Sequence, residues 1–155
     1  FASKMEIEAA EDLPRAMRES RIVITCTTAR RYFVTRDMVE PGTFIAAVGA
    51  DHEEKQEIEP QLLAHAKLVT DVTDQACKIG DLHHAIEAGV LTRAAVHAEL
   101  GEVVAGHKPG RERDDETIVF DSTGTGLQDV AAAIAVYRKA LEARAGRPFV
   151  LSEAA

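Results

Sequence analysis

Four short apolar runs separated by helix-like segments limit the folds that this chain can adopt. The runs occupy residues 22–25, 44–48, 68–72 and 117–120. The first, Ile22-Val-Ile-Thr25, is β-branched and continuous, which is typical of a strand covered on both faces. Helical patterns lie at 11–18, 61–66 and 96–103, and a longer amphipathic stripe is formed by Leu127, Val130, Ile134, Tyr137 and Leu141. Alternating strands and helices predict an α/β domain with a parallel sheet and crossover helices.

Composition narrows the class of protein. The 155 residues carry a net charge of -8 and are 46% hydrophobic, as expected for one soluble globular domain. An acidic chain is a poor match for nucleic acid or anionic membrane as its main partner. The longest apolar run, 130–137, is too short to span a bilayer, and we expect no secretory signal. Two cysteines cannot form a disulfide framework, so we expect a reducing cytoplasm.

Ligands in open parallel sheets gather at the carboxyl ends of the strands. The first strand is followed by Cys26-Thr27-Thr28, whose small side chains would let a flat ring or a phosphate approach the backbone. The same residues are ordinary turn formers, and spacing alone leaves both interpretations open.

The second strand is followed by Gly49 and Asp51. The glycine allows either an unusual backbone angle or a close approach. Asp51 is the first ionisable residue after an apolar run, and a carboxylate at the mouth of an apolar crevice can have a raised pKa and act as an acid or base. Asp is also a favoured helix N-cap, so both roles stay open.

The last strand is followed by the segment 121–126, which contains Ser122 and opens the long helix with exposed N–H groups. Gly124-x-Gly126 resembles a dinucleotide fingerprint, but Asp129 stands where a third small residue is needed. We therefore reject it as a pyrophosphate loop. The residues alone predict a crevice, lined by Thr27, Gly49, Asp51 and Ser122.

Other chemistries find little support. The six histidines lack the spacing of a zinc site, so we predict no metal and interpret them as surface or packing residues. Cys26 has no evident base that would make it a nucleophile. The sequence contains neither a Gly-x-Ser-x-Gly elbow nor a phosphate loop with Gly-Lys-Ser/Thr.

The strand-end segments taken together resemble the ornithine cyclodeaminase/mu-crystallin family. The resemblance covers nearly the whole chain in order. Its segments are 22–28, 41–51 with Lys55, Glu57 and Pro60, 99–106, 109–111, 115–116, 120–124 and 128–129. It implies a homodimeric protein that depends on NAD or NADP, with a Rossmann-type parallel sheet and flanking helices. The implied chemistry is hydride exchange between a nicotinamide and the α-carbon of an amino or imino acid, as in cyclodeaminases, ketimine reductases and alanine dehydrogenases.

The resemblance also implies residue roles. Asp51 matches the family's catalytic aspartate, a proton donor or acceptor near the imine carbon. The implied cofactor contacts are Cys26, Thr27 and Thr28 beside the adenosine part, Val48, Gly49 and Lys55 near the nicotinamide ribose, and Ser122 close to the nicotinamide ring.

This chain departs from the family pattern at its start. The family's glycine-rich loop, its ribose-binding acidic residue and its N-terminal substrate and dimer domain would lie upstream of Phe1. We therefore expect residues 1–145 to form a Rossmann-type domain without its first βαβ unit, followed by a tail at 146–155. The alternatives to an enzyme are a non-catalytic, mu-crystallin-like protein that binds NAD(P)H or another ligand, and an inactive truncated fragment.

Overall fold

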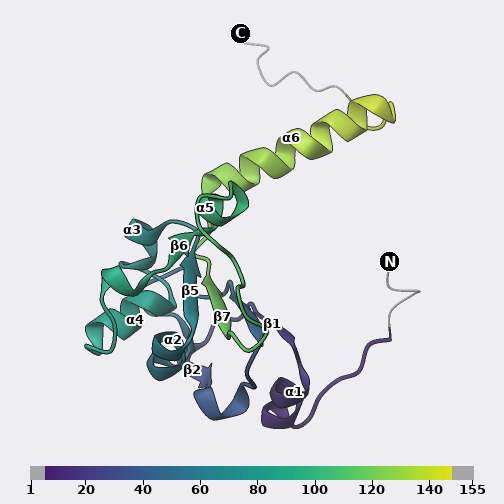
Figure 1. Cartoon of the computed structure of the whole chain (residues 1–155). Coiled ribbons are helices and arrows are strands. Elements are labelled where there is room, and N and C mark those ends of the chain that lie inside the picture. The colour runs from purple at the N-terminus through teal and green to yellow at the C-terminus, as the bar shows by residue number, and fades with distance from the viewer. Residues whose placement is uncertain (1–5, 148–155) are drawn as a thin grey trace. The chain divides into compact units, whose positions relative to one another are not determined.

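A five-stranded parallel sheet forms the centre of the computed structural model, which describes residues 6–147. Its order is β1-β3-β7-β5-β6, and every neighbouring pair is parallel. The strands are β1 (Ile22–Thr25), β3 (Phe44–Ala47), β5 (Lys67–Thr70), β6 (Ala98–Glu99) and β7 (Ile118–Asp121). The four strands expected from the sequence are confirmed, with small shifts at their ends. Parallel strands with flanking helices make this a Rossmann-like α/β fold (Figure 1).

Several short elements escaped the sequence analysis. A second parallel pair joins β2 (Arg30–Val34) to β4 (Gln56–Ile58), and α3 (Thr73–Ala76) and α4 (Asp81–Glu87) follow β5. The helix expected at 96–103 is partly wrong, because residues 98–99 form β6 and α5 covers only Leu100–Val104. Backbone pairing with β5 therefore overrides the apolar spacing at the start of that segment.

Local sequence explains where the two expected early helices begin. In α1 (Leu13–Glu19), the carboxylate of Asp12 accepts a hydrogen bond from the backbone N–H of Arg15, which caps the helix. In α2 (Pro60–His65), Pro60 takes the first helical position, where no backbone N–H is needed.

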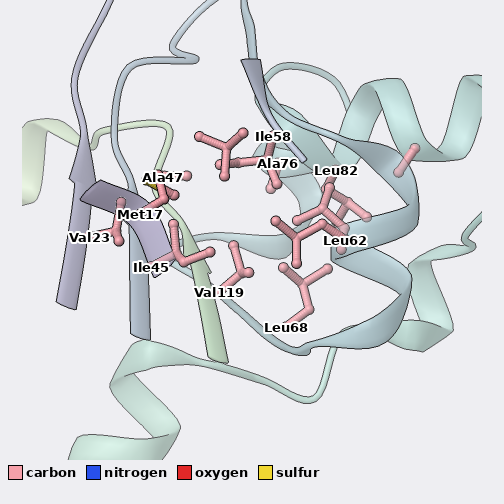
Figure 2. Packing of buried hydrophobic residues seen from close by; sticks show 13 residues of the cluster. Met17, Val23, Ile45, Ala47, Ile58, Leu62, Leu68, Ala76, Leu82 and Val119 are labelled. Atoms are coloured by element: carbon pink, nitrogen blue, oxygen red, sulfur yellow. The ribbon is translucent and has the colours of Figure 1, made fainter. Parts of the chain in front are cut away.

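The core lies on one face of the sheet. The strand register aligns Val23, Ile45, Val119 and Leu68 across four strands. Figure 2 shows these side chains gathered with Leu62 of α2 and Leu82 of α4. The helices α2, α3 and α4 lie together on this side of the sheet (Figure 1). These three helices, which precede and follow β5 in the chain, thus cover one face of the sheet.

The opposite face is only partly covered in the region that the structure describes. Ile22 and Ile24 of the edge strand β1 are 68% and 70% exposed, so the expectation that β1 is covered on both faces is wrong here. Farther along the sheet, side chains from α5 reach this face and enclose an apolar cavity of about 250 Å³, lined by Phe44, Lys67, Val69, Leu100, Val103, Gly110, Ile118 and Phe120.

The long amphipathic helix predicted near the end of the chain is confirmed as α6 (Gly126–Glu142). Reciprocal hydrogen bonds between Thr125 and Gln128 cap its start. It belongs to a second unit that begins at Gly124, and its apolar stripe is exposed. The predicted boundary after residue 145 stays a prediction, and 148–155 lie outside the described residues. None of the helices within 6–147 is long and apolar enough to cross a membrane.

Candidate functional site

The carboxyl ends of β1, β3 and β7 lie side by side and carry most of the predicted site residues. Thr25, Ala47 and Asp121 are register partners across the three strands. Just beyond them, the N–H of Val48 donates to the Thr25 carbonyl and the N–H of Ser122 to the Ala47 carbonyl, both at 2.9 Å. The segments 26–28, 48–49 and 122 therefore meet at one edge of the sheet, as expected for a ligand site in a parallel fold.

A buried carboxylate ties two of these loops together. Glu57 of β4 is fully buried and accepts four hydrogen bonds. Its Oε1 accepts from the N–H and the hydroxyl of Thr27, at 2.6 and 2.7 Å. Its Oε2 accepts from the hydroxyl of Thr25 at 2.6 Å and the N–H of Gly49 at 3.0 Å. Charge-assisted bonds of this kind are stronger than neutral ones, so the loops after β1 and β3 are firmly joined.

Gly49 is needed for close approach rather than for an unusual backbone angle. Its φ lies outside the left-handed region. A Cβ at this position would lie 2.3 Å from Oε1 of Glu57 and 2.6 Å from the backbone nitrogen of Thr27. Only a residue without a side chain lets the Glu57 carboxylate reach both loops, which resolves the two interpretations that the sequence left open.

Asp51 lies in the exposed segment between β3 and β4, and its surroundings differ from those expected. Its carboxylate forms an ion pair with Lys55 at 2.5 Å, and it lines a cavity of about 520 Å³ with Arg30, His52, Glu54 and Lys55. The expected apolar crevice is therefore wrong, because every residue around this cavity is polar or charged. The N-cap role is also wrong, because a turn and β4 follow Asp51.

The pKa of Asp51 is held below its ordinary value, mainly by the hydrogen bond from Lys55. A raised pKa was expected from burial, but the side chain is 58% exposed, and the desolvation that remains is too weak to outweigh the lysine. Asp51 is therefore ionised near neutral pH.

Ser122 is buried at this edge of the sheet, and its side chain is not exposed to solvent. Its hydroxyl donates to Asp71 Oδ2 at 3.2 Å, and the N–H of Thr123 donates to the same oxygen at 2.8 Å. Asp71 follows β5, so its carboxylate joins the ends of β5 and β7. The cavity that contains Asp51 includes none of Thr27, Gly49 and Ser122, so the four predicted residues share an edge of the sheet but not one crevice.

Two further buried carboxyls were missed by sequence reasoning. Asp81, at the start of α4, accepts the N–H groups of Glu57 and Ile58 at its Oδ1, both at 2.8 Å. Its other oxygen, Oδ2, is buried without a hydrogen bond. Asp121, at the end of β7, accepts the N–H of Leu82 at 2.8 Å. Burial raises the pKa of Asp81 to about 7 and that of Asp121 well above its ordinary value.

This arrangement predicts an unusual pH dependence of stability. Because the pKa of Asp81 is higher in the folded than in the unfolded protein, folding favours the protonated carboxyl. The free energy of unfolding should therefore fall as pH rises from about 4 to about 7. The fall should be on the order of 4 kcal/mol, since the two pKa values lie about three pH units apart and each unit is worth about 1.4 kcal/mol.

Asp81→Asn tests this expectation. Asparagine keeps the oxygen that accepts from Glu57 and Ile58 but cannot ionise, so the share of the pH dependence that Asp81 contributes should disappear. The share due to the buried Asp121 should remain. Asp81→Ala should instead destabilise at every pH, because it leaves two buried N–H groups without an acceptor. Urea unfolding of the full-length protein at about pH 5 and about pH 8 measures both effects. An unchanged pH slope in Asp81→Asn would show that Asp81 does not hold the proton.

The remaining expectations concern metals and nucleophiles. No group of His, Cys, Asp or Glu suited to a metal ion occurs within residues 6–147. Two histidines serve in packing instead: a ring nitrogen of His84 bonds the carbonyl of Lys55, and one of His97 bonds that of Pro109. Cys26 is an exposed free thiol at the strand end.

The model of the ornithine cyclodeaminase/mu-crystallin family matches residues 1–144. Among solved structures, an archaeal alanine dehydrogenase dimer with bound NAD superposes with a TM-score of 0.84 at 40% identity, over 93% of this chain and 45% of that one. The iminosuccinate reductase of Paracoccus denitrificans with NAD+ gives 0.82 at 40% identity, over 90% and 42%.

A third solved structure is the Δ1-pyrroline-2-carboxylate reductase of Thermococcus litoralis in complex with NADH and L-proline. It gives a TM-score of 0.82 at 32% identity, over 90% of this chain and 44% of that one. The chain likewise spans about 44% of the length of curated relatives that it matches at 40–42% identity. The similarity therefore covers nearly all of this chain and less than half of each relative.

Proposed function

The chain belongs to the ornithine cyclodeaminase/mu-crystallin family, and we propose that it forms the nicotinamide side of an NAD-dependent oxidoreductase. Its substrate would be an amino or imino acid, with hydride exchange at the α-carbon. One observation carries the proposal: the loops after β1, β3 and β7 meet at a single edge of a sheet that superposes on three proteins solved with NAD+, NAD or NADH. The full-length protein would act as a homodimer, in keeping with the archaeal relative, which was solved as a dimer.

The residues at this edge suit a dinucleotide. The side chains of Cys26, Thr27 and Thr28 are exposed and small, so they can lie against a sugar or a ring without blocking the backbone. Gly49 keeps the neighbouring loop close to them. Val48 and Lys55 would contact the nicotinamide ribose, and Ser122 would lie close to the nicotinamide ring. When bound, NADH would supply a hydride to an imino acid, and NAD+ would accept one from an amino acid.

Asp51 would transfer the proton that accompanies the hydride. Its carboxylate is exposed at the same edge and is kept ionised by Lys55, so it can accept a proton when an amino acid is oxidised. In the reductive direction, the same carboxyl would deliver the proton to the imine. Lys55 then has two roles, a cofactor contact and the partner that sets the charge of Asp51.

One observation favours a second candidate, a non-catalytic protein that binds NAD(H) in the manner of mu-crystallin. Asp51 is closely paired with Lys55, and a carboxylate in a stable ion pair is a weaker base than a free one. In that case cofactor would bind and no substrate would be turned over.

Turnover of a small substrate panel separates the two candidates. Loss of NADH absorbance is followed with the full-length protein and Δ1-pyrroline-2-carboxylate, pyruvate with ammonia, or oxaloacetate with ammonia. Ornithine with NAD is tested for ammonia release. The oxidoreductase proposal predicts steady NADH oxidation either with Δ1-pyrroline-2-carboxylate or with one of the two ketoacids in the presence of ammonia. NADH binding with no turnover of any of them would favour the binding protein.

A further inference from the structure

The strongest unexplained feature of this edge is the connection that Glu57 makes between two loops. Glu57 belongs to β4, which is not part of the main sheet, yet its carboxylate contacts the residues that follow β1 and β3. None of the ion pairs formed by residues 6–147 includes Glu57. A buried carboxylate without a cationic partner is costly, so the hydrogen bonds that it accepts must offset its desolvation.

The four donors are divided evenly between its two oxygens. Oε1 holds the loop after β1 through the N–H and hydroxyl of Thr27. Oε2 accepts from Thr25 of β1 and from Gly49 of the loop after β3. One planar carboxylate therefore fixes the spacing between the two loops. Replacing either accepting oxygen by a donor group would disturb that spacing.

Asp51 depends on this connection through the backbone. The N–H of Asp51 donates to the carbonyl of Gly49 at 3.1 Å. Gly49 is also the residue whose own N–H donates to Glu57. The backbone of Glu57 is itself held in place, because its N–H donates to the buried carboxyl of Asp81. Displacement of Glu57 would therefore move Asp51 relative to Thr27 without removing any group that meets substrate or cofactor.

We propose that Glu57 is a positioning residue, whose buried carboxylate sets the placement of Asp51 against the loop of Thr27. This inference rests on the proposed function of the edge as a nicotinamide site. Glu57 does not touch the reacting atoms and acts through Gly49 and Thr27. A misplaced proton-transfer group would lower turnover more than it lowers cofactor binding, because reaction rates depend steeply on alignment.

Glu57→Gln is the sharpest variant. The amide has the same shape but only one accepting oxygen, while backbone N–H groups approach both oxygens of Glu57, from Thr27 on one side and Gly49 on the other. In either orientation, one backbone N–H faces the amide NH₂ group and loses its acceptor. One of the two loops is therefore released. Glu53→Gln, at an exposed glutamate four residues earlier, is the matched control.

The experiment measures kcat per NADH-binding site and Kd for NADH in the full-length protein, with the number of binding sites found by titration. Glu57→Gln should lower kcat per site by about tenfold or more, with a smaller rise in Kd, and Glu53→Gln should change neither. A purely structural role would reduce the number of binding sites and leave kcat per site unchanged, which would overturn the inference.

Thr25→Val serves if Glu57→Gln does not fold. It removes one hydroxyl donor to Oε2 from a buried threonine and keeps the shape of the side chain. It should lower kcat per site in the same direction by a smaller factor, and an unchanged kcat per site would contradict the inference. Absence of NADH binding by the unmodified protein would instead overturn the proposed function, so the two failures are distinguishable.

Discussion

Replacement of Asp51 by asparagine is expected to lower kcat by about a thousandfold, because a positioned proton-transfer group contributes roughly 100- to 10,000-fold. Asparagine keeps the size of the side chain and can still accept a hydrogen bond from Lys55, so the loop should keep its shape. The Kd for NADH should stay close to that of the unmodified protein, since proton transfer is needed only in the chemical step. Steady-state kinetics with the best substrate of the panel, together with NADH titration, measure both quantities.

Asp74→Asn is the matched control. Asp74 is also an exposed aspartate whose pKa is lowered by a basic partner, here Arg93, but it lies in α3. The same chemical change there should leave kcat and Kd unaltered. Full activity in Asp51→Asn would refute the proton-transfer role, and equal losses in both variants would point to a general effect of removing surface charge.

Gly49→Ala is expected to have the largest effect on stability. The added methyl would lie 2.3 Å from a carboxylate oxygen of Glu57 and 2.6 Å from a backbone nitrogen, so neither a rotamer change nor a small shift relieves the contact. Overpacking together with weakened bonds to Glu57 should lower the free energy of unfolding by about 3 kcal/mol or more. Any folded protein should bind NADH weakly, because the loops after β1 and β3 are forced apart.

Gly101→Ala provides the comparison. Gly101 lies in α5, and a Cβ there would meet nothing within 4 Å. Alanine at this helical position should stabilise by roughly 0.5–1 kcal/mol. Denaturant unfolding of both variants in the full-length protein measures the difference. A Gly49→Ala protein as stable as the original would show that the Glu57 carboxylate does not require this close approach.

The sequence predicted the sheet well because its strands are encoded by local, continuous apolar runs. The runs at 22–25 and 44–48 became β1 and β3, and their carboxyl ends could be placed at one edge without knowledge of any side-chain contact. Strand β6, at the other end of the sheet, was missed because two residues, 98–99, are too few to produce a pattern. Its place is set by pairing with β5 instead.

The chemistry around the edge was harder to predict, because buried carboxylates look like surface residues in a sequence. Glu57 belonged to the family resemblance, but nothing local indicated that it is fully buried under two loops. The burial of Asp81 and Asp121 could not be seen in the local sequence either, because the N–H groups that donate to their carboxyls lie 23 to 40 residues away along the chain. The weak signal for Asp121 was its place directly after an apolar strand.

Asp51 illustrates the opposite error. Five apolar residues before it suggested an apolar crevice and a raised pKa. The chain instead becomes exposed at Asp51, directly after the buried Ala50, and Lys55 pairs with the carboxylate. Apolar residues in a strand describe the surroundings of the strand itself. The surroundings of the following loop depend on its own charged residues, here Asp51 and Lys55, which are four positions apart.

Hydrogen exchange of the full-length protein with and without NADH tests the central claim most directly. If the edge formed by β1, β3 and β7 holds the cofactor, NADH should slow exchange in peptides that cover 26–29, 48–51 and 122–123. It should leave unchanged the peptides around 36–39 and 113–117, which border a cavity that contains none of the predicted site residues. NADH binding without protection at the three strand-end segments, or no binding at all, would contradict the account.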